Sequence, residues 1–329
     1  LCALLLAGCG AGKQKILNIY HAGSLTCPFS RLEDAFEKKH PDVDVRRHAH
    51  GSALAVRQVT QLGKQADIVG VADYSLIDRM MIENSGKKWA SWNLRFATNE
   101  MVVAIGSDAP DISTDNWQQV LGSPDVTVGF SNPRNDPCGY RAIMVLRLSG
   151  LVGDEPGLFE KIVAPNSNIE LTTEGETSIL HMPRTVNVAG KLRMREKETD
   201  LVSLLQSGAL DFGFIYRSVA VQQGLDFVTL PPELNLGSPD HARTYGRVTV
   251  VIEEDEGTTR LEGQPISYGV TVPRTVRHTE LAQEFVQMLV TESGAGMLSE
   301  CGLRPTRPAA PSPASAEDDV PFSLSTSGD

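Results

Sequence analysis

The chain is short of basic residues, and this shortage limits what it can bind. Its 329 residues include 30 Lys and Arg against 41 Asp and Glu, which gives a formal net charge of -11. Nucleic acids and acidic membrane surfaces attract clustered positive charge, so neither is expected as a direct partner. An anionic ligand would have to be held by local geometry against an unfavourable overall field.

The apolar start of the sequence, residues 1–8, is too short to span a bilayer. It lacks a starting Met and ends in Leu-Ala-Gly-Cys at residues 6–9, which is typical of the tail of a secretory leader. This ending resembles the bacterial lipobox, in which the leader is cleaved before a Cys that carries the lipid. We therefore expect residues 1–12 to be a truncated lipoprotein leader and tether, with lipidation at Cys9 and an extracytoplasmic location. The alternative is an ordinary signal peptide with a chance Cys.

Cysteine is scarce in the rest of the chain. Beyond Cys9 only Cys27, Cys138 and Cys301 occur, an odd number without the spacing of a metal site. We interpret them as core or isolated thiols and leave one disulfide open, because a location outside the cytosol permits it.

The motifs of common enzymes are missing as well. There is no G-x-x-x-x-G-K-[ST] phosphate loop and no dinucleotide fingerprint, so no nucleotide cofactor is expected. No G-x-S-x-G elbow surrounds Ser24, so a secreted serine hydrolase built on Ser24 and His21 is only a remote alternative. His48 and His50 share one face of an expected strand, but no Cys, Asp or Glu at matching spacing completes a metal site, which favours surface histidines. We expect no enzymatic activity and no cofactor.

What the sequence does contain is a regular alternation of strand and helix patterns. The segment 28–40 places Phe29, Leu32 and Phe36 on one helical face. Short apolar runs such as Met101–Ile105 predict the intervening strands. Repeated units of this length predict an α/β fold with parallel or mixed sheets covered by helices, in one large or two medium domains.

Three expected strands are followed directly by helices, at Ser24, Ser52 and Asp136. A helix start presents unpaired N–H groups at the positive end of its dipole, so it can hold an anion without a cationic side chain. Each residue alone is explained as a helix N-cap. Three at strand ends together indicate a ligand site, because open α/β sheets bind ligands at the carboxyl ends of their strands.

Six short motifs follow one another along the chain. They are His21–Leu25, Gly51-Ser52, Ala72–Tyr74, Gly129–Pro133, Asp136–Arg141 and Phe214–Tyr216. Together, in order from about Ile16 to Gly302, they resemble the archaeal-type molybdate and tungstate binding proteins of ABC importers. The resemblance implies a two-lobed type II periplasmic binding protein, each lobe a mixed sheet flanked by helices, with the oxyanion in the cleft between the lobes. It also implies a monomer that works with a permease and its ATPase.

The resemblance also assigns roles to individual residues. Backbone N–H and hydroxyl groups of one lobe would donate to the oxyanion, a loop of the other lobe would face them, and a phenol would donate from a strand end. Two carboxylates, from Asp136 and Glu198, would bind the molybdenum or tungsten atom itself and complete octahedral coordination, with Glu196 as the alternative register for Glu198. The full set of ligand-binding residues is Gly23, Ser24, Ser52, Arg134, Asn135, Asp136, Glu198 and Tyr216.

The two carboxylates separate the possible ligands. Beside a dianion in a poorly screened cleft they cost several kcal/mol of repulsion, so they are not expected in a sulfate site. Molybdenum and tungsten centres can accept additional oxygen ligands, and hard oxygen donors suit them. The main alternative is a binding protein of the same fold for another oxyanion such as sulfate or phosphate, which would need no carboxylate pair.

The same resemblance divides the chain into lobes. Lobe I is expected to take residues 13–98 and 265–302, and lobe II residues 99–264. Two crossings near Thr98 and Gln264 would form a hinge, so the lobes are expected to close on the ligand. Residues 303–329 are rich in Pro, Ala, Ser and acids and are expected to form a largely unpacked tail.

Overall fold

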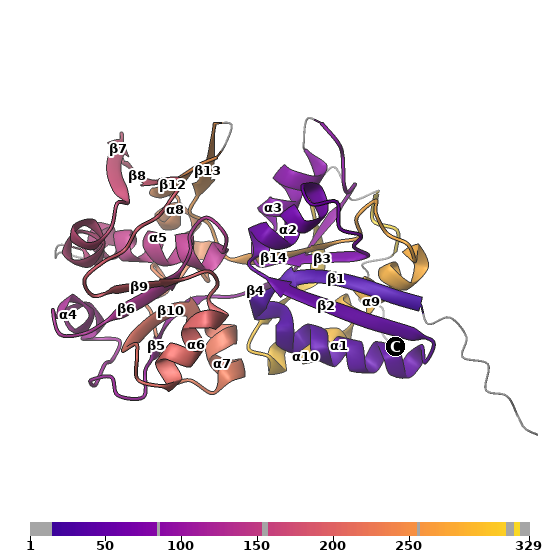
Figure 1. Cartoon of the computed structure of the whole chain (residues 1–329), viewed down its shortest axis with the longest axis horizontal. Helices are drawn as coiled ribbons and strands as arrows, with labels where there is room; N and C mark the ends of the chain where they lie inside the picture. Colours follow the sequence, from indigo (N-terminus) through magenta and orange to yellow (C-terminus); the bar gives the residue numbers. More distant parts are fainter. Residues whose placement is uncertain (1–14, 84–85, 153–156, 255–256, 314–318, 323–329) are drawn as a thin grey trace, which may run out of the picture.

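A computed structural model of the chain describes residues 15–83, 86–152, 157–254, 257–313 and 319–322. The expected leader and its lipidation site Cys9 lie outside these residues. Two lobes stand side by side, each with its own central sheet (Figure 1). Among the described residues, no helix is both long and apolar enough to cross a membrane.

Lobe I contains a six-stranded mixed sheet in the order β15-β4-β14-β3-β1-β2. Strand β1 pairs in parallel with β2 and β3, whereas β14 and β15 run antiparallel to their neighbours. The strands are β1 (Lys15–Ala22), β2 (Val43–His50), β3 (Ile68–Val71), β4 (Asn93–Thr98), β14 (Ser267–Thr271) and β15 (Arg304–Ser312). The helices and helical turns are η1 (Gly23–Leu25), α1 (Thr26–Lys39), α2 (Ser52–Thr60), α3 (Ser75–Ile77), η2 (Asp78–Ile82), α9 (Thr279–Val290) and α10 (Glu292–Glu300).

Lobe II contains a five-stranded sheet, β11-β5-β10-β6-β9, and a separate four-stranded sheet, β13-β12-β8-β7. The strands are β5 (Met101–Ile105), β6 (Val128–Ser131), β7 (Glu170–Glu174), β8 (Thr177–Met182), β9 (Leu192–Arg195), β10 (Phe212–Tyr216), β11 (Phe227–Thr229), β12 (Val248–Glu253) and β13 (Thr258–Glu262). The helices and helical turns are α4 (Trp117–Gly122), α5 (Pro137–Val152), η3 (Phe159–Val163), η4 (Ala164–Asn166), α6 (Thr199–Gln206), α7 (Arg217–Gln223), η5 (Pro239–His241) and α8 (Ala242–Tyr245).

Helix α1 shows how sequence periodicity becomes packing. Phe29, Leu32 and Phe36, at helical spacing, are fully buried. The rings of Phe29 and Phe36 pack edge-on against Phe285 of α9, with centroid distances of 6.0 and 5.3 Å. The polar face of α1 is left at the surface, as an amphipathic helix requires.

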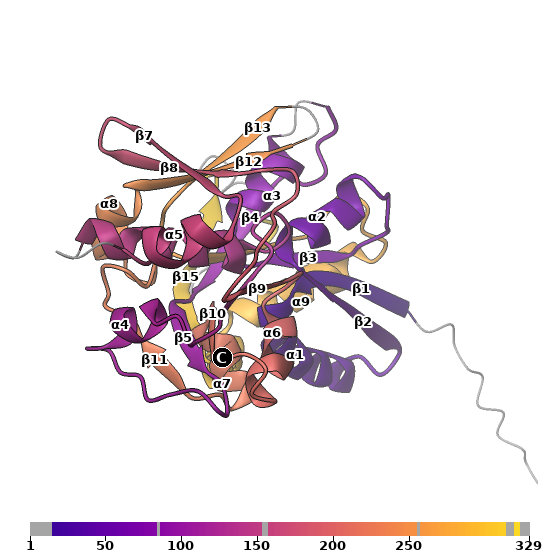
Figure 2. The same cartoon turned by 60° about the vertical axis from the view of Figure 1, so that its left-hand side comes forward.

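Helix α5 lies in the middle of lobe II, between the two sheets (Figure 2). Consecutive residues such as Ile143, Met144, Val145 and Leu146 are all buried. A helix buried on every side needs apolar residues all round, which is the pattern of this segment. The helix therefore holds its N-terminal residue, Pro137, in a fixed place at the boundary between the lobes.

The end of the chain differs from the sequence-based expectation. Arg304–Ser312 is not an unpacked tail but strand β15, which pairs antiparallel with β4 at the edge of the lobe I sheet. Ser312 donates to Asp78 Oδ2, and the Phe322 ring packs edge-on against Trp92 at 6.1 Å. The prolines of β15 led to the expectation of an unpacked tail. They are compatible with a strand at a sheet edge, because Pro lacks an N–H and an edge strand does not need every N–H to pair.

One disulfide joins Cys27 at the start of α1 to Cys301 just after α10, with a Cα–Cα distance of 5.9 Å. Cys138 remains an unpaired, buried thiol. Of the alternatives left open by the sequence, the structure therefore selects one disulfide and one core thiol.

Candidate ligand-binding site

Four turns meet where the lobes touch. Lobe I contributes the residues after β1 and β2, and lobe II contributes the residues before α5 and α6. A Cβ atom added at Gly23 would lie 3.1 Å from Thr199 Cγ2, and one added at Gly51 would lie 2.3 Å from the carbonyl oxygen of Asn135. The two backbones are thus in direct contact at Gly51, where no side chain can be accommodated without movement. The strand ends that the sequence singled out are brought together in this closed arrangement.

The hydroxyl groups of Ser24 and Ser52 are buried at this junction. Ser24 Oγ accepts a hydrogen bond from Tyr268 OH at 3.0 Å, and Ser52 Oγ accepts one from the Ala72 N–H at 3.0 Å. Because each oxygen already accepts, each hydroxyl keeps its own hydrogen to donate. Two fixed O–H donors in a buried place are suited to the oxygens of an anion.

These two serines are not helix N-caps. Helix α2 begins at Ser52 with Gly51 as its N-cap, turn η1 has Ala22 as its N-cap, and neither has a side-chain capping bond. Asp136 does cap a helix, because its Oδ1 accepts from the Cys138 N–H at 3.1 Å. The capping explanation is therefore wrong for Ser24 and Ser52 and correct for Asp136.

Asp136 and Glu198 form a buried carboxylate pair. Asp136 Oδ2 accepts from the Glu198 N–H at 2.7 Å, and Glu198 Oε2 accepts from the Tyr216 N–H at 3.0 Å. Burial raises the pKa of Asp136, and burial together with the charge of Asp136 raises the pKa of Glu198 to about 8. In the described part of the chain neither carboxylate has an ion-pair partner. Two buried acids without a direct ion-pair partner favour a ligand with an electron-poor centre.

The structure distinguishes Glu198 from its neighbour Glu196. Glu198 is 3% exposed and faces Asp136, whereas Glu196 is exposed and accepts hydrogen bonds from the side chains of Asn132 and Asn135. This geometry favours Glu198 over Glu196 as the second carboxylate.

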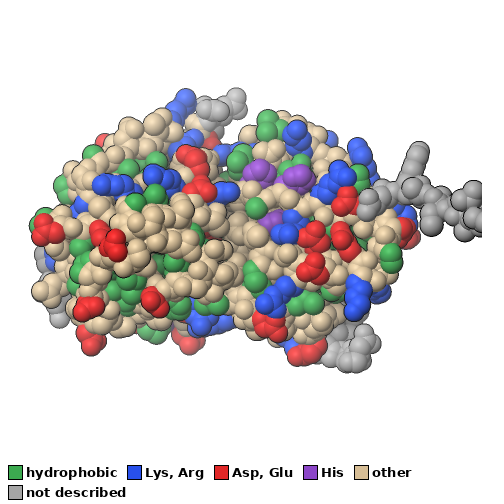
Figure 3. All heavy atoms as spheres, turned by 60° about the horizontal axis from the view of Figure 1, so that its bottom comes forward, with side chains coloured by type: hydrophobic (Ala, Val, Ile, Leu, Met, Phe, Trp, Pro, Cys, Tyr) green, Lys and Arg blue, Asp and Glu red, His purple; other side chains and the backbone are tan. Residues whose placement is uncertain are grey.

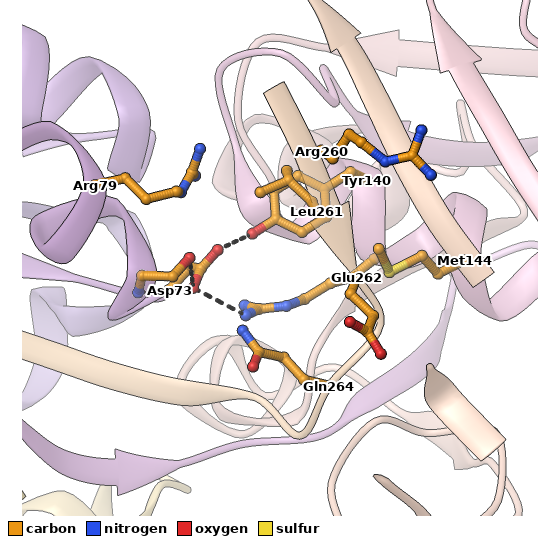
Figure 4. Close-up of a pocket in the computed structure, with 10 residues that line it drawn as sticks. Asp73, Arg79, Tyr140, Met144, Arg260, Leu261, Glu262 and Gln264 are labelled. Atoms are coloured by element: carbon orange, nitrogen blue, oxygen red, sulfur yellow. Dashed lines mark hydrogen bonds and ion pairs between the residues drawn. The ribbon is translucent and has the colours of Figure 1, made fainter. Parts of the chain in front are cut away.

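Tyr216 and Arg141 connect this pair to lobe I. Arg141 is 3% exposed, and its Nη1 donates to Tyr216 OH at 2.6 Å and to the carbonyl of Ala72 at 2.7 Å. Its Nη2 lies 3.8 Å from Asp73 Oδ1, and the phenol of Tyr140 donates to Asp73 Oδ2 (Figure 4). Since Tyr216 OH accepts from Arg141, its own hydrogen is available for a ligand.

No role was assigned to Arg141 from the sequence, although it ends the most specific motif. The available signal was a charged residue in the otherwise apolar first half of a helix, where a buried guanidinium requires partners. The partners lie on β10 and after β3, so their proximity could not be read from the local sequence.

Arg134 lies at the edge of the site. Its Nη1 donates to the carbonyl of Pro183 at 3.4 Å and to that of Glu253, so the guanidinium is directed toward the four-stranded sheet. Both Arg134 and Asp136 line a cavity of about 220 Å³ between the lobes. The other residues predicted for the site lie together at the junction of the lobes. Arg134 lies beside them, in the wall of this cavity.

The hydrolase and metal alternatives find no support. His21 Nδ1 donates to the carbonyl of Ala22 at 2.8 Å, and burial lowers the pKa of His21 to about 4. Its Nε2 has no hydrogen-bond partner in the described chain, so His21 is not positioned as a base for Ser24. His48 stacks on Tyr20 at 4.6 Å, and within the described ranges no group of three or more His, Cys, Asp or Glu side chains could hold a metal ion.

The surface agrees with the composition. On the face drawn in Figure 3, acidic and basic side chains are interspersed over both lobes, and histidine side chains gather on lobe I beside the junction. This face therefore offers no continuous basic patch of the kind that nucleic acids require.

Comparison with known proteins adds independent information. The family described as bacterial extracellular solute-binding protein matches residues 17–304. An uncharacterized solute-binding protein of Methanoculleus marisnigri is 39% identical over 302 residues, covering 91% of this chain and 84% of the relative. The molybdate/tungstate-binding protein WtpA of Pyrococcus abyssi is 40% identical over 314 residues, covering 90% of this chain and 88% of the relative. The resemblance stated from the motifs is thereby confirmed.

Among solved structures, the periplasmic molybdate-binding protein of Azotobacter vinelandii matches with a TM-score of 0.61 and 16% identity. The match covers 87% of this chain and 98% of that protein. It confirms the two-lobed α/β fold, and at this identity it supports the fold alone.

Proposed function

The chain belongs to the bacterial extracellular solute-binding protein family, and from this premise we propose that it captures molybdate or tungstate for an ABC importer. The ligand would lie between the lobes, held by the N–H groups and hydroxyls near Gly23, Ser24, Ser52 and Asn135 and by the phenol of Tyr216. The name of the Pyrococcus relative supports this choice of ligand. A permease and its ATPase would then take up the anion, and lipidation at Cys9 would keep the protein at the membrane.

The observation that carries the proposal is the buried carboxylate pair, which has no direct ion-pair partner among the described residues. A site for sulfate or phosphate would place the ionised forms of Asp136 and Glu198 against a dianion, and both carboxylates would then repel it. A molybdenum or tungsten atom can instead accept one oxygen from each carboxylate and reach six oxygen ligands. Ligation would replace the repulsion with two bonds, and abundant sulfate would be rejected because sulfur cannot accept these oxygens.

The lobes would open to admit the ligand. The chain passes between them from β4 to β5 and from β13 to β14, and these crossings would form the hinge. Closure joins Arg141 to Ala72 and brings Gly51 against Asn135. We propose residues 13–98 and 265–302, together with strand β15 that the structure adds to the same sheet, as one rigid body and residues 99–264 as the other.

Isothermal titration with molybdate, tungstate, sulfate and phosphate tests this function. Glu198→Ala is expected to weaken tungstate binding by at least about ten-fold, or about 1.4 kcal/mol, because one metal ligand is lost. Glu196→Gln, a control two residues away that keeps an acceptor oxygen for the side chains of Asn132 and Asn135, should bind as wild type does. Comparable affinities of the wild type for sulfate and tungstate, or equal tungstate affinities of both variants, would contradict the proposal.

A further inference from the structure

The cavity of about 220 Å³ lies between lobe I and the β12–β13 strands of lobe II. Its walls include Asp136 of the candidate site, so it adjoins the place proposed for the anion. Three guanidinium groups also line it, those of Arg57, Arg79 and Arg134. The lining also contains the carboxylates of Asp136 and Glu254, so cations outnumber acids around this cavity in a chain whose formal net charge is -11.

Two of these guanidinium groups already have partners. Arg57 Nη2 lies 3.3 Å from Glu254 Oε2, which links α2 of lobe I to the end of β12 in lobe II. Arg134 donates to backbone carbonyls of the same region, including that of Glu253. Both cations are therefore partly satisfied without a ligand.

Arg79 is different. Its Nε is buried and has no hydrogen-bond partner, and its side chain forms no ion pair with any residue that the structure describes. The nearby carboxylate of Asp73 already accepts from Ser75, Tyr140 and, at longer range, Arg141.

Figure 4 shows the Arg79 side chain extending from its helical turn toward Tyr140. Arg79 also lines the second interlobe cavity, of about 160 Å³, which has Tyr140 and Leu261 in common with the first. Arg79 thus lines both interlobe cavities.

A buried N–H without a partner is unfavourable, and a guanidinium group presents paired donors that match two oxygens of an oxyanion. We propose that Arg79 holds a second oxyanion site, which an incoming tetrahedral dianion occupies before it reaches Asp136 and Glu198. The inference rests on the proposed function for the identity of the anion. It assigns to Arg79 a role in the rate of capture and none in coordination of the metal.

Stopped-flow measurement of tungstate association tests this role. Arg79→Gln should lower the association rate constant by about three- to ten-fold at low salt, with the difference shrinking as salt is added, because steering is screened. The dissociation rate constant should stay within about two-fold, since release starts from the central site. Lys38→Gln, the same charge change on the exposed face of α1, should associate at the wild-type rate.

Two further measurements make the outcome decisive. Arg79→Lys keeps the positive charge and should retain most of the association rate, which would show that the effect comes from charge and not from packing. Thermal melting of all three variants checks that they fold. In crystals soaked with tungstate, anomalous density is expected beside the guanidinium in wild type and absent in Arg79→Gln.

A wild-type association rate in Arg79→Gln, or no density beside Arg79 in a wild-type crystal whose central site is occupied, would overturn the second site. Absence of tungstate binding by the wild type in solution would instead contradict the proposed function. In that case density beside Arg79 alone would still support an oxyanion site there.

Discussion

At the scale of single residues, Asp136 and Glu198 are buried acids that face each other and accept hydrogen bonds from peptide N–H groups. The charge of the Arg141 guanidinium favours the ionised forms and acts to lower both pKa values. Burial dominates instead, so the ligand-free protein keeps a proton at Glu198 near neutral pH. The pair is costly in the absence of a ligand, which is expected of a binding residue more than of a structural one.

This cost predicts a pH dependence of stability. The pKa of Glu198 is about 8 in the folded protein, against 4.5 for an unperturbed glutamate side chain. The folded state therefore binds the proton more tightly, and the stabilisation present below pH 4.5 is lost as the pH rises toward 8. The melting temperature of the ligand-free protein should fall over this range, and Glu198→Gln should flatten the slope and raise the melting temperature at about pH 8. Glu196→Gln should keep the wild-type slope; equal slopes in the two variants would contradict the assignment.

Gly51 gives a second prediction at this scale. Its φ of -63° is open to any residue, so only the contact with Asn135 across the lobes requires glycine. Gly51→Ala should weaken ligand binding by about ten-fold or more, because closure would force the new methyl group against a carbonyl oxygen. The control is Gly296→Ala in α10, where a Cβ meets nothing within 4 Å. Titration calorimetry of both variants measures the effect, and unchanged binding by Gly51→Ala would show that the lobes do not close in this way.

Sequence reasoning reached most of these residues but not all. Ser24, Ser52 and Asp136 could be found because each follows an apolar run that ends at a helix start. The choice of Glu198 over Glu196 depends on which side of a turn faces α5, and local sequence does not determine that. The proximity of Arg141 to Ala72 is a contact between lobes, which depends on the tertiary fold.

At the scale of elements, α5 and β15 show where pattern reading succeeds and fails. The start of α5 was predicted because Asp136 and Pro137 are both typical of the first residues of a helix. Strand β15 was missed because Pro, Ala and Ser are typical of unpacked segments, and its partner β4 lies far earlier in the chain. Amino-acid composition does not indicate that a segment pairs with a distant strand at the edge of a sheet.

The disulfide between Cys27 and Cys301 belongs to the same scale, because it fixes α1 to the end of α10. Removing it with the double change Cys27→Ser and Cys301→Ser should lower the free energy of unfolding by about 2–5 kcal/mol, since the cross-link closes a long loop. Denaturant unfolding with and without dithiothreitol measures this. The reductant should destabilise the wild type and leave the double variant unchanged, whereas a wild type that does not respond would contradict a structural role.

At the scale of the whole molecule, the two lobes lie on either side of the site. Ligand binding is expected to shift the equilibrium from an open to a closed form. Gln222 of lobe II donates to the carbonyls of Ser24 and Cys301 in lobe I, so the contacts between the lobes extend from the ligand site to the end of α10. Under the proposed function, such contacts would let a permease distinguish a closed, loaded protein from an open one.

The most direct test of the central claim is the number of oxygen atoms around the bound metal. X-ray absorption at the tungsten edge, recorded on the tungstate complex in solution, reports the coordination number without depending on affinity. Six oxygen ligands in the wild type, with fewer in Glu198→Gln and six again in Glu196→Gln, are the predicted result. Four oxygen ligands in all three proteins would show that Asp136 and Glu198 do not bind the metal and would contradict the account.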